Sequence, residues 1–494
     1  MTLKINIIYC LFFLITLSSA IKISIGNNNN DDDGDYYTAS VLEFSPSLIY
    51  SEKDIISNLK AFEYYANLAS KNGSQIIVFP EYGIASGNFN TRDSILPYLE
   101  YIPDPKASNE PIIPCRNIEF KNRTILETLS CIAKQNNIVV VADMGDIQPC
   151  TNSSSTNDCP SDGRFQFNTL VAFSEAGELI ARYHKSHLYN EPFFNPSPTP
   201  DPITFTTSFN VTFGMLICFD IMFGQPQTDL IQQYNIKNLV YATEWVNVNY
   251  AYAREIQQSW SRLNGANILA ANIGMASFFS GSGIYSNGNV LNSFVNPTMK
   301  PMTQLLTAKV PKDPSQANIA DKQQHSNHHH YQNNIVNELI RSPTSINLTM
   351  VPFEPNCQTD APPITVTADN NGLHCQFTYS SPHMASGASS IPLFSLIAYS
   401  GNFNDFFNAQ ICAVSICSGS TADTCMNNVF DSSIYFDSVS IQGNFESGYH
   451  IAPTITTVPI ANYFGDYKSG SNAITVSNIT NPFLGVGLFS IEWD

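Results

Sequence analysis

The chain has 494 residues, of which 43% are hydrophobic and 12% aromatic, so it can form sizeable cores rather than remain disordered. At about 150 residues per domain, this length allows roughly three domains, or two when one of them is large. The 41 acidic and 23 basic residues give a formal net charge of −18. This balance disfavours broad contact with nucleic-acid phosphates or anionic lipid headgroups, so no nucleic-acid partner is expected.

The first 20 residues have the pattern of a secretory signal peptide. Lys4 precedes an apolar run over 5–17, and the small residues Ser18 and Ala20 stand at the −3 and −1 positions of a cleavage site. The run is shorter than the roughly 20 residues that a membrane-spanning helix needs, so cleavage is expected rather than anchoring. Residues 21–36, rich in Asn and Asp, predict a flexible acidic tail.

The rest of the sequence is typical of a secreted protein, or of one in a lumenal, endolysosomal compartment. No later run is apolar for long enough to span a bilayer, and the C-terminal residues lack a lipid-anchor signal, so neither feature is expected. Six N-x-S/T sequons suit a glycoprotein, although each one is weak support in so Asn-rich a chain. They lie at Asn72, Asn122, Asn152, Asn210, Asn347 and Asn478.

Eleven cysteines predict disulfide bonds in such an oxidising compartment. Without Cys10, which lies in the signal peptide, ten remain in two groups of five. Because each group is odd, bridges within domains leave one thiol over in each, either buried or reactive. The groups are Cys115, Cys131, Cys150, Cys159 and Cys218, and then Cys357, Cys375, Cys412, Cys417 and Cys425.

Residues 37–310 alternate between strand and helix patterns and predict an α/β domain with a covered sheet. A strand over 36–44 is followed by a helix over 53–71, whose apolar residues recur every three or four positions. Ser51 suits its N-terminal cap and Gly73 its end. Further helices are expected near 125–135, 229–234 and 252–263, between apolar β runs.

Residues 311–340 are polar and repetitive and predict a linker or surface loop. The histidines of this segment have no Cys or carboxylate at ligand spacing, so a solvated loop is favoured over a metal site; they are His325, His328, His329 and His330. From 341 to 494, strand-like runs between turn residues show no helical period. These runs predict a separate, smaller β-rich C-terminal domain.

Three chemically reactive side chains stand at the ends of predicted strands: Glu81 in IIVFPEYG, Lys185 in IARYHKSHLYNE, and Cys218 in FGMLICFDIMF. In an α/β sheet, strand ends are where side chains leave the core and meet at a pocket. Singly, these residues are typical of a capping carboxylate, a surface charge and a core thiol. Together they supply the base, cation and nucleophile needed to cleave a C–N bond through an acyl-thioester.

These segments resemble the nitrilase superfamily of C–N hydrolases, in which Glu, Lys and Cys occur in this order after three strands. Met222 departs from the broad pattern, which has Arg at that point, and CFDIMF is instead similar to the vanin and biotinidase branch. Further similarity to that branch spans about 37–300 and includes GDIQPC, CPSDGRFQFNT and TEWVN, and the cysteines of the last third are similar to its C-terminal domain. The resemblance implies a four-layer αββα sandwich followed by the β-rich domain.

The resemblance also implies a role for each reactive residue. Cys218 would be the nucleophile, Glu81 the general base, and Lys185 the cation that stabilises the oxyanion, together with the backbone N–H of Phe219. Glu191 would orient the lysine. With Cys218 kept as a thiol, the other cysteines of its group form two bridges, and local pairs, 115–131 and 150–159, are expected.

Four other residues near these segments are further candidates for roles in the site. Asp220 is expected to support the site rather than act as an acid. The ring of Trp245 either lines the substrate pocket or is a core residue. His184 and His187 flank Lys185. For both histidines, a structural role is favoured over a role in adjusting the properties of Lys185. No metal or organic cofactor is expected.

The resemblance implies a secreted amidohydrolase acting on a secondary amide of a small, vitamin-like molecule. Vanins convert pantetheine to pantothenate and cysteamine, and biotinidase releases biotin from biocytin; pantetheine is the favoured substrate here. Two alternatives remain: a non-catalytic secreted binding protein on the same fold, and hydrolysis of a nitrile. The intact Glu, Lys and Cys disfavour the first, and the vanin-like segments disfavour the second.

Overall fold

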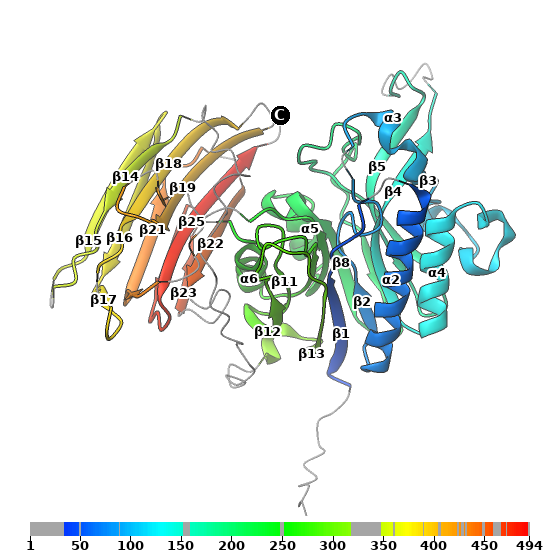
Figure 1. Cartoon of the computed structure of the whole chain (residues 1–494), viewed down its shortest axis with the longest axis horizontal. Coiled ribbons are helices and arrows are strands. Elements are labelled where there is room, and N and C mark those ends of the chain that lie inside the picture. Colours follow the sequence, from blue (N-terminus) through cyan, green and yellow to red (C-terminus); the bar gives the residue numbers. More distant parts are fainter. Residues whose placement is uncertain are drawn as a thin grey trace, which may run out of the picture. The chain divides into compact units, whose positions relative to one another are not determined.

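Two β-sheets stacked face to face form the first part of the chain in the computed structural model (Figure 1). The structure describes residues 34–492 except 49–50, 88, 152–158, 248–250, 318–346, 359–360, 389, 404–406, 422–423, 426–428, 430–431, 447–449, 458–465 and 471. All of its helices and strands belong to one unit, Tyr36–Asp494. The predicted signal peptide and the histidines of 325–330 lie outside the described residues.

The first sheet has seven strands in the order β13-β1-β2-β4-β5-β6, with β3 also paired to β4. Strand β2 pairs in parallel with both β1 and β4, whereas β13, β5 and β6 run antiparallel to their neighbours. The bounds are β1 Tyr36–Glu43, β2 Ile76–Val78, β3 Leu99–Glu100, β4 Val139–Pro149, β5 Arg164–Phe173, β6 Leu179–His184 and β13 Gln304–Pro311.

The second sheet has six strands in the order β12-β11-β10-β9-β8-β7, with β8, β9 and β10 parallel. Their bounds are β7 Thr204–Thr206, β8 Thr212–Ile217, β9 Asn238–Thr243, β10 Asn267–Asn272, β11 Ser282–Ser286 and β12 Asn289–Phe294. The helices are α2 Glu52–Lys71, α3 Arg92–Ile95, α4 Thr124–Asn136, α5 Gln227–Gln232 and α6 Ala253–Asn264. Short 3₁₀ turns occur at Leu96–Tyr98, Pro105–Ala107, Pro114–Arg116, Ile118–Phe120, Cys218–Met222 (η5) and Pro314–Gln316.

Side chains along the strands of the first sheet point alternately to the helices on one face and to the second sheet on the other. Ile77 and Val140 pack against Leu59 and Phe62 of α2 and Leu129 of α4, which cover the outer face (Figure 1). Successive side chains of a strand point to opposite faces of the sheet. The residues next to Ile77 and Val140 in the sequence therefore point inward and pack against the second sheet. Helix α6 packs on β10 and β11 of that second sheet. The predicted αββα order of layers is therefore confirmed.

The capping residues in the sequence correctly predicted the ends of helix α2. Helix α2 begins one residue before the predicted 53, and the Ser51 N–H donates to the Asp54 carboxylate (2.8 Å) in a capping box. It ends at Lys71, followed by Gly73 at φ +83, a left-handed conformation that costs glycine little. The expected linker, by contrast, overlaps ordered structure, because β13 pairs with β1 as far as Pro311 and a 3₁₀ turn follows.

The C-terminal part consists of two further five-stranded sheets, in the orders β14-β18-β19-β25-β22 and β15-β16-β21-β24-β23. Among its described residues there is no α-helix, as predicted. The bounds are β14 Thr349–Phe353, β15 Ile364–Asn370, β16 Leu373–Ser380, β17 His383–Met384, β18 Phe394–Phe403, β19 Phe407–Ile416, β20 Ile434–Tyr435, β21 Ser438–Gly443, β22 His450–Thr457, β23 Asp466–Ser469, β24 Ala473–Ser477 and β25 Phe483–Glu492.

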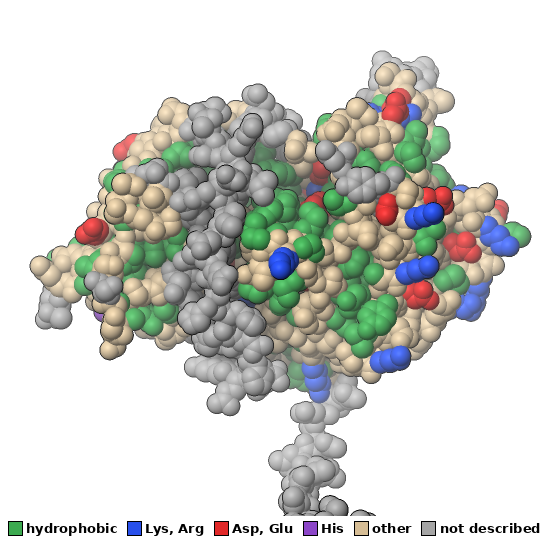
Figure 2. Space-filling model, in the orientation of Figure 1, with side chains coloured by type: hydrophobic (Ala, Val, Ile, Leu, Met, Phe, Trp, Pro, Cys, Tyr) green, Lys and Arg blue, Asp and Glu red, His purple; other side chains and the backbone are tan. Residues whose placement is uncertain are grey.

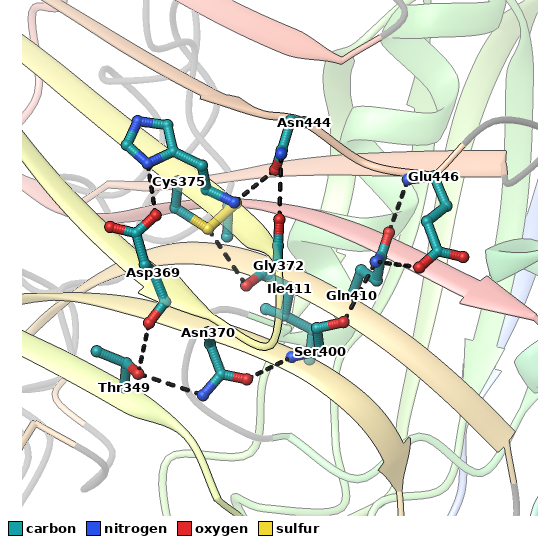
Figure 3. The surroundings of a disulfide bond; sticks show 12 residues. Thr349, Asp369, Asn370, Gly372, Cys375, Ser400, Gln410, Ile411, Asn444 and Glu446 are labelled. Carbon is teal, nitrogen blue, oxygen red and sulfur yellow. Dashed lines mark hydrogen bonds and ion pairs between the residues drawn. A yellow bond between two sulfur atoms is a disulfide. The ribbon is translucent and has the colours of Figure 1, made fainter.

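A disulfide joins these two C-terminal sheets. Cys375 on β16 is bonded to Cys412 on β19, and Figure 3 shows polar side chains around the bridge. Asn370 at the end of β15 accepts from the Ser400 N–H of β18 (2.9 Å) and donates to the Thr349 hydroxyl of β14 (3.2 Å). A covalent bond and these hydrogen bonds therefore fix the two sheets together.

The remaining described cysteines form three more disulfides and two free thiols. The pairs Cys115–Cys131 and Cys150–Cys159 are those expected, and Cys417 pairs with Cys425. Cys218 is free and buried, and Cys357 is free and partly buried. The odd count of each group is thereby explained.

On the surface, acidic and basic side chains are mixed rather than segregated over α2 and α4 on the face shown in Figure 2. In the part of the chain that the structure describes, no helix is long and apolar enough to cross a membrane.

Candidate active site

Glu81, Lys185 and Cys218 meet at the ends of strands from both sheets of the α/β part. Glu81 follows β2, Lys185 follows β6, and Cys218 follows β8, so three chain segments deliver one side chain each. The Lys185 ammonium donates to Glu81 Oε1 across 2.7 Å, and both charges act on the thiol of Cys218. Their exposures of 1% (Glu81), 2% (Lys185) and 7% (Cys218) place them in a nearly water-free environment.

Lys185 is held between two carboxylates. Its Nζ donates to Glu191 Oε2 (2.6 Å) as well as to Glu81. Glu191 is itself fixed by the backbone N–H of Tyr189 (3.0 Å) and the phenolic hydroxyl of Tyr82 (2.6 Å). Because the two carboxylates outweigh the effect of burial, the pKa of Lys185 lies well above its usual value, and the side chain stays charged.

Both oxygens of Glu81 have fixed partners. Oε1 accepts from Lys185 and from Asn168 Nδ2 (2.9 Å), and Oε2 accepts from the backbone N–H of Glu244 (2.8 Å). Asn168 also donates to Glu191 Oε1 (2.7 Å) and so links the two glutamates. Burial raises the pKa of Glu81 above its usual value, although Lys185 opposes the shift. A buried carboxyl with a raised pKa is suited to accept and return a proton during catalysis.

Cys218 opens η5 in a backbone conformation that is rare for any residue other than glycine, with φ at +43. Such strain persists only where the surroundings impose it, and here the Tyr241 hydroxyl donates to the Cys218 carbonyl (2.8 Å). Burial and the charge of Glu81 raise the pKa of the thiol, while Lys185 and the hydroxyl of Thr243 lower it. Without a base, this thiol therefore stays protonated.

Asp220 joins the turn that carries Cys218 to the segment that carries Lys185. Its carboxylate accepts from the Tyr183 hydroxyl (2.7 Å) and from the N–H and Nδ1 of His187 (2.8 and 2.9 Å). It also accepts from the backbone N–H groups of Ser186 (3.2 Å) and Ile217 (3.3 Å). Through these contacts Asp220 links the turn of Cys218 to the segment of Lys185, which is a supporting position.

The other residues singled out from the sequence have clear positions. Phe219 follows Cys218 in η5, with its side chain 7% exposed. Trp245 is 8% exposed, and its indole N–H donates to the Ala251 carbonyl (2.9 Å). His184 contacts Asp146 (2.8 Å) and stacks on a neighbouring phenylalanine, and His187 contacts Asp220 as above. Both histidines are therefore bound to aspartates.

Two acids beside Glu81, one buried and one partly buried, were missed from the sequence. Asp143 on β4 accepts from the Tyr82 N–H (2.9 Å), and burial and Glu81 raise its pKa well above the usual value. Glu244 follows β9, and burial raises its pKa to about 8. Glu81, Asp143 and Glu244 thus each have a raised pKa, and burial is the largest cause for all three. Asn168 was also missed, although a polar residue within the apolar strand β5 was a usable signal.

Comparison with known proteins agrees with this architecture. The family model Carbon-nitrogen hydrolase matches residues 47–259, and Vanin C-terminal domain matches residues 340–494. Biotinidase from Takifugu rubripes is 32% identical over 81% of this chain and 80% of its own length. Pantetheinase from Mus musculus is 32% identical over 87% of this chain and 82% of its own length.

Over shorter stretches the identity is higher. Pantetheinase from Homo sapiens is 43% identical over 233 residues, which cover 46% of this chain and 44% of that protein. Among solved structures, an amidase from Nesterenkonia sp. aligns with a TM-score of 0.39 at 18% identity, covering 58% of this chain and 95% of that chain.

The fold and these matches define a carbon–nitrogen hydrolase of the nitrilase superfamily, an enzyme that cleaves amides. Within that superfamily, the chain belongs to the vanin and biotinidase branch, since a biotinidase and a pantetheinase match 81% and 87% of its length.

Proposed function

We propose that this enzyme cleaves the secondary amide of pantetheine through an acyl-thioester on Cys218, releasing pantothenate and cysteamine. The observation that supports the proposal is the convergence of a free thiol, a carboxylate and an ammonium in one buried site. Proteins named pantetheinase are among the relatives that match this chain.

In the first step, Glu81 takes the proton of the Cys218 thiol, and the sulfur attacks the amide carbonyl. The raised pKa of the thiol makes this base necessary, because little thiolate exists in the resting enzyme. The carbonyl carbon gains a C–S bond, and its oxygen gains a negative charge. Two of the three N–H donors of Lys185 bond carboxylates among the described residues, which leaves the third for that oxygen.

The intermediate then collapses. The C–N bond breaks, Glu81 gives its proton to the departing amine, and the acyl group remains on sulfur. A water molecule next attacks the thioester, with Glu81 again accepting a proton. The C–S bond breaks, Glu81 returns this proton to the sulfur to restore the thiol, and the carboxylic acid leaves. The backbone N–H of Phe219 is placed in this proposal as the second donor to the oxyanion.

The mechanism is tested with the full chain and pantetheine, with product release followed by mass spectrometry. Cys218→Ala is expected to abolish turnover, whereas Cys357→Ala, at the other free thiol among the described cysteines, is expected to keep it. Glu81→Gln should also slow alkylation of Cys218 by iodoacetamide, because the thiol then lacks its base. Activity that survives in Cys218→Ala would overturn the assignment.

Biotin amides are the second candidate, because a biotinidase matches this chain as extensively as a pantetheinase does. Both substrates are secondary amides, and the same three side chains serve both. Parallel assays with pantetheine and biocytin decide between them through the ratio of their kcat/KM values. A ratio above one for biocytin would replace pantetheine, and turnover of neither would reject both.

We also propose that the enzyme is secreted or lumenal and glycosylated. Four disulfides among the described residues need an oxidising compartment, and the five sequon asparagines within the described residues are exposed. Expression in eukaryotic cells should yield a glycosidase-sensitive product in the medium or a lumenal compartment, with its N-terminus after Ala20. A full-length cytosolic product would contradict this.

A further inference from the structure

The C-terminal β-rich part contacts the turn that carries Cys218. Strands β22 and β25 both touch η5, and Phe407, the first residue of β19, contacts the side chain of Phe219 with ring centroids 5.2 Å apart. Phe219 is bonded directly to Cys218 along the chain. A residue about 190 positions further along the sequence thus lies one side chain away from the nucleophile.

Tyr189 completes an aromatic cluster at this place. Its ring lies 5.1 Å from Phe219 at an interplanar angle of 64° and 6.4 Å from Phe407. Edge-to-face and tilted pairs at such distances are favourable contacts. We call Tyr189, Phe219 and Phe407 the aromatic wall.

The wall has a buried and an open side. Phe219 and Phe407 are 7% and 5% exposed, whereas Tyr189 is 43% exposed. Tyr189 also lies near the reacting groups, since its backbone N–H donates to Glu191, which accepts from Lys185. The wall therefore extends from solvent to the immediate neighbour of the nucleophile.

Because Phe219 is the next residue after Cys218, an acyl group on that sulfur forms next to one end of this wall. In both candidate substrates the scissile carbonyl carries a chain of methylene groups, and aromatic side chains are suited to cover such a chain. The wall carries no formal charge, unlike the Glu81 and Lys185 side of the site.

We propose that Phe407 is a specificity-determining residue, through which the C-terminal domain completes the binding site for the methylene chain next to the scissile carbonyl. This inference rests on the proposed acyl-enzyme chemistry at Cys218. It assigns the C-terminal domain a direct part in substrate selection.

The test is a series of cysteamine amides whose acyl chains lengthen from acetyl to hexanoyl. In the wild-type enzyme, each buried methylene should raise kcat/KM by about fourfold. In Phe407→Ala the increase should fall below about twofold per methylene, mainly through KM. We call the increase in kcat/KM per methylene the slope. Phe407→Leu should restore most of the slope, because leucine returns apolar volume.

Ile451→Ala is the matched control. Ile451 lies on β22 and lines a separate cavity against α6, so its truncation perturbs the same contact region away from the wall. A wild-type slope in Phe407→Ala, or an equal loss of slope in Ile451→Ala, would overturn the inference. If Phe407→Ala does not fold, Phe407→Val decides: an unchanged slope rejects the role of the residue.

The outcomes separate this inference from the proposed function. If the wild-type enzyme cleaves no amide of the series and no pantetheine or biocytin, the acyl-enzyme proposal fails. If it cleaves them and the Phe407 variants keep the wild-type slope, only the role of Phe407 fails.

Discussion

Tyr82 donates its phenolic proton to Glu191 across 2.6 Å, although the residues lie on segments more than 100 positions apart. Burial and neighbouring carboxylates raise the pKa of Tyr82 well above its usual value, so the phenol remains a donor throughout the accessible pH range. The bond fixes Glu191, which in turn holds Lys185. Tyr82 itself is placed by Asp143, which accepts its backbone N–H.

Tyr82→Phe is expected to lower activity without unfolding the enzyme. A hydrogen bond to a charged group contributes about 1.5–3 kcal/mol, so kcat/KM should fall by about 10-fold to 100-fold as Lys185 loses its fixed position. The comparison is Tyr234→Phe, at an exposed tyrosine, which should keep wild-type kinetics. Equal kcat/KM for Tyr82→Phe and wild type would show that Glu191 keeps its position without the hydrogen bond from Tyr82.

Asn168→Asp should damage both activity and stability, because it replaces a donor to two carboxylates with a third acceptor. We expect kcat/KM to fall by more than about 100-fold and the free energy of unfolding at pH 8 to fall by about 3–5 kcal/mol. At pH 5 the introduced carboxyl is more often protonated and can donate, so the loss of stability should be smaller. Kinetics and denaturant unfolding at both pH values measure this.

Asn195→Asp is the matched control for that substitution. Asn195 Oδ1 accepts from Arg92 (2.8 Å) and from the Gln166 N–H (3.0 Å), and an aspartate keeps both acceptor roles. Its stability should remain within about 0.5 kcal/mol of wild type. A loss for Asn168→Asp that does not depend on pH would contradict the electrostatic explanation.

Sequence patterns were sufficient to predict an α/β domain and the strand ends at which Glu81, Lys185 and Cys218 stand, whereas the order of the four layers was implied by the family resemblance. These patterns were sufficient because apolar alternation and helix caps are local signals, and strand ends share an edge of the sheet. They did not predict that Asn168 would lie between two glutamates, nor that Glu244 would offer its N–H to Glu81. These contacts depend on strand register and on the stacking of two sheets.

The position of Phe407 could not be predicted from the sequence either, because it depends on contacts between residues far apart in the chain. A phenylalanine at the start of a β-strand in the C-terminal part has no local feature that connects it to Cys218. Only the packing of β22 and β25 on η5 brings it there.

Asp220→Ala should lower stability and slow catalysis together. The carboxylate is fully buried and accepts from two side chains and three backbone N–H groups, which would all lose a partner. We expect the free energy of unfolding to fall by about 3–5 kcal/mol, since each unsatisfied buried donor costs about 1–3 kcal/mol and relaxation recovers part of it. Asp201→Ala, at an exposed position, should change stability little. Wild-type stability in Asp220→Ala would exclude a supporting role.

Glu43, at the end of β1, provides a test of pH-dependent stability outside the candidate active site. It is fully buried, accepts from the Gly281 N–H (3.0 Å), and is hydrogen-bonded to the Ser280 hydroxyl. Burial raises its pKa from 4.5 to about 7. The folded protein therefore holds a proton that the unfolded chain releases at lower pH. Its contribution to stability is complete below pH 4.5 and is lost as the pH rises through 7.

Glu43→Gln should remove this dependence, because a glutamine stays neutral at every pH. Relative to wild type, the variant should become more stable by about 2.5 kcal/mol between pH 5 and pH 8, as the linkage of a carboxyl with these two pKa values requires. Denaturant unfolding of both proteins at the two pH values gives the difference directly. Glu63→Gln, at an exposed position on α2, should show no such change. The same stability difference between Glu43→Gln and wild type at both pH values would mean that Glu43 is ionised in the folded enzyme throughout.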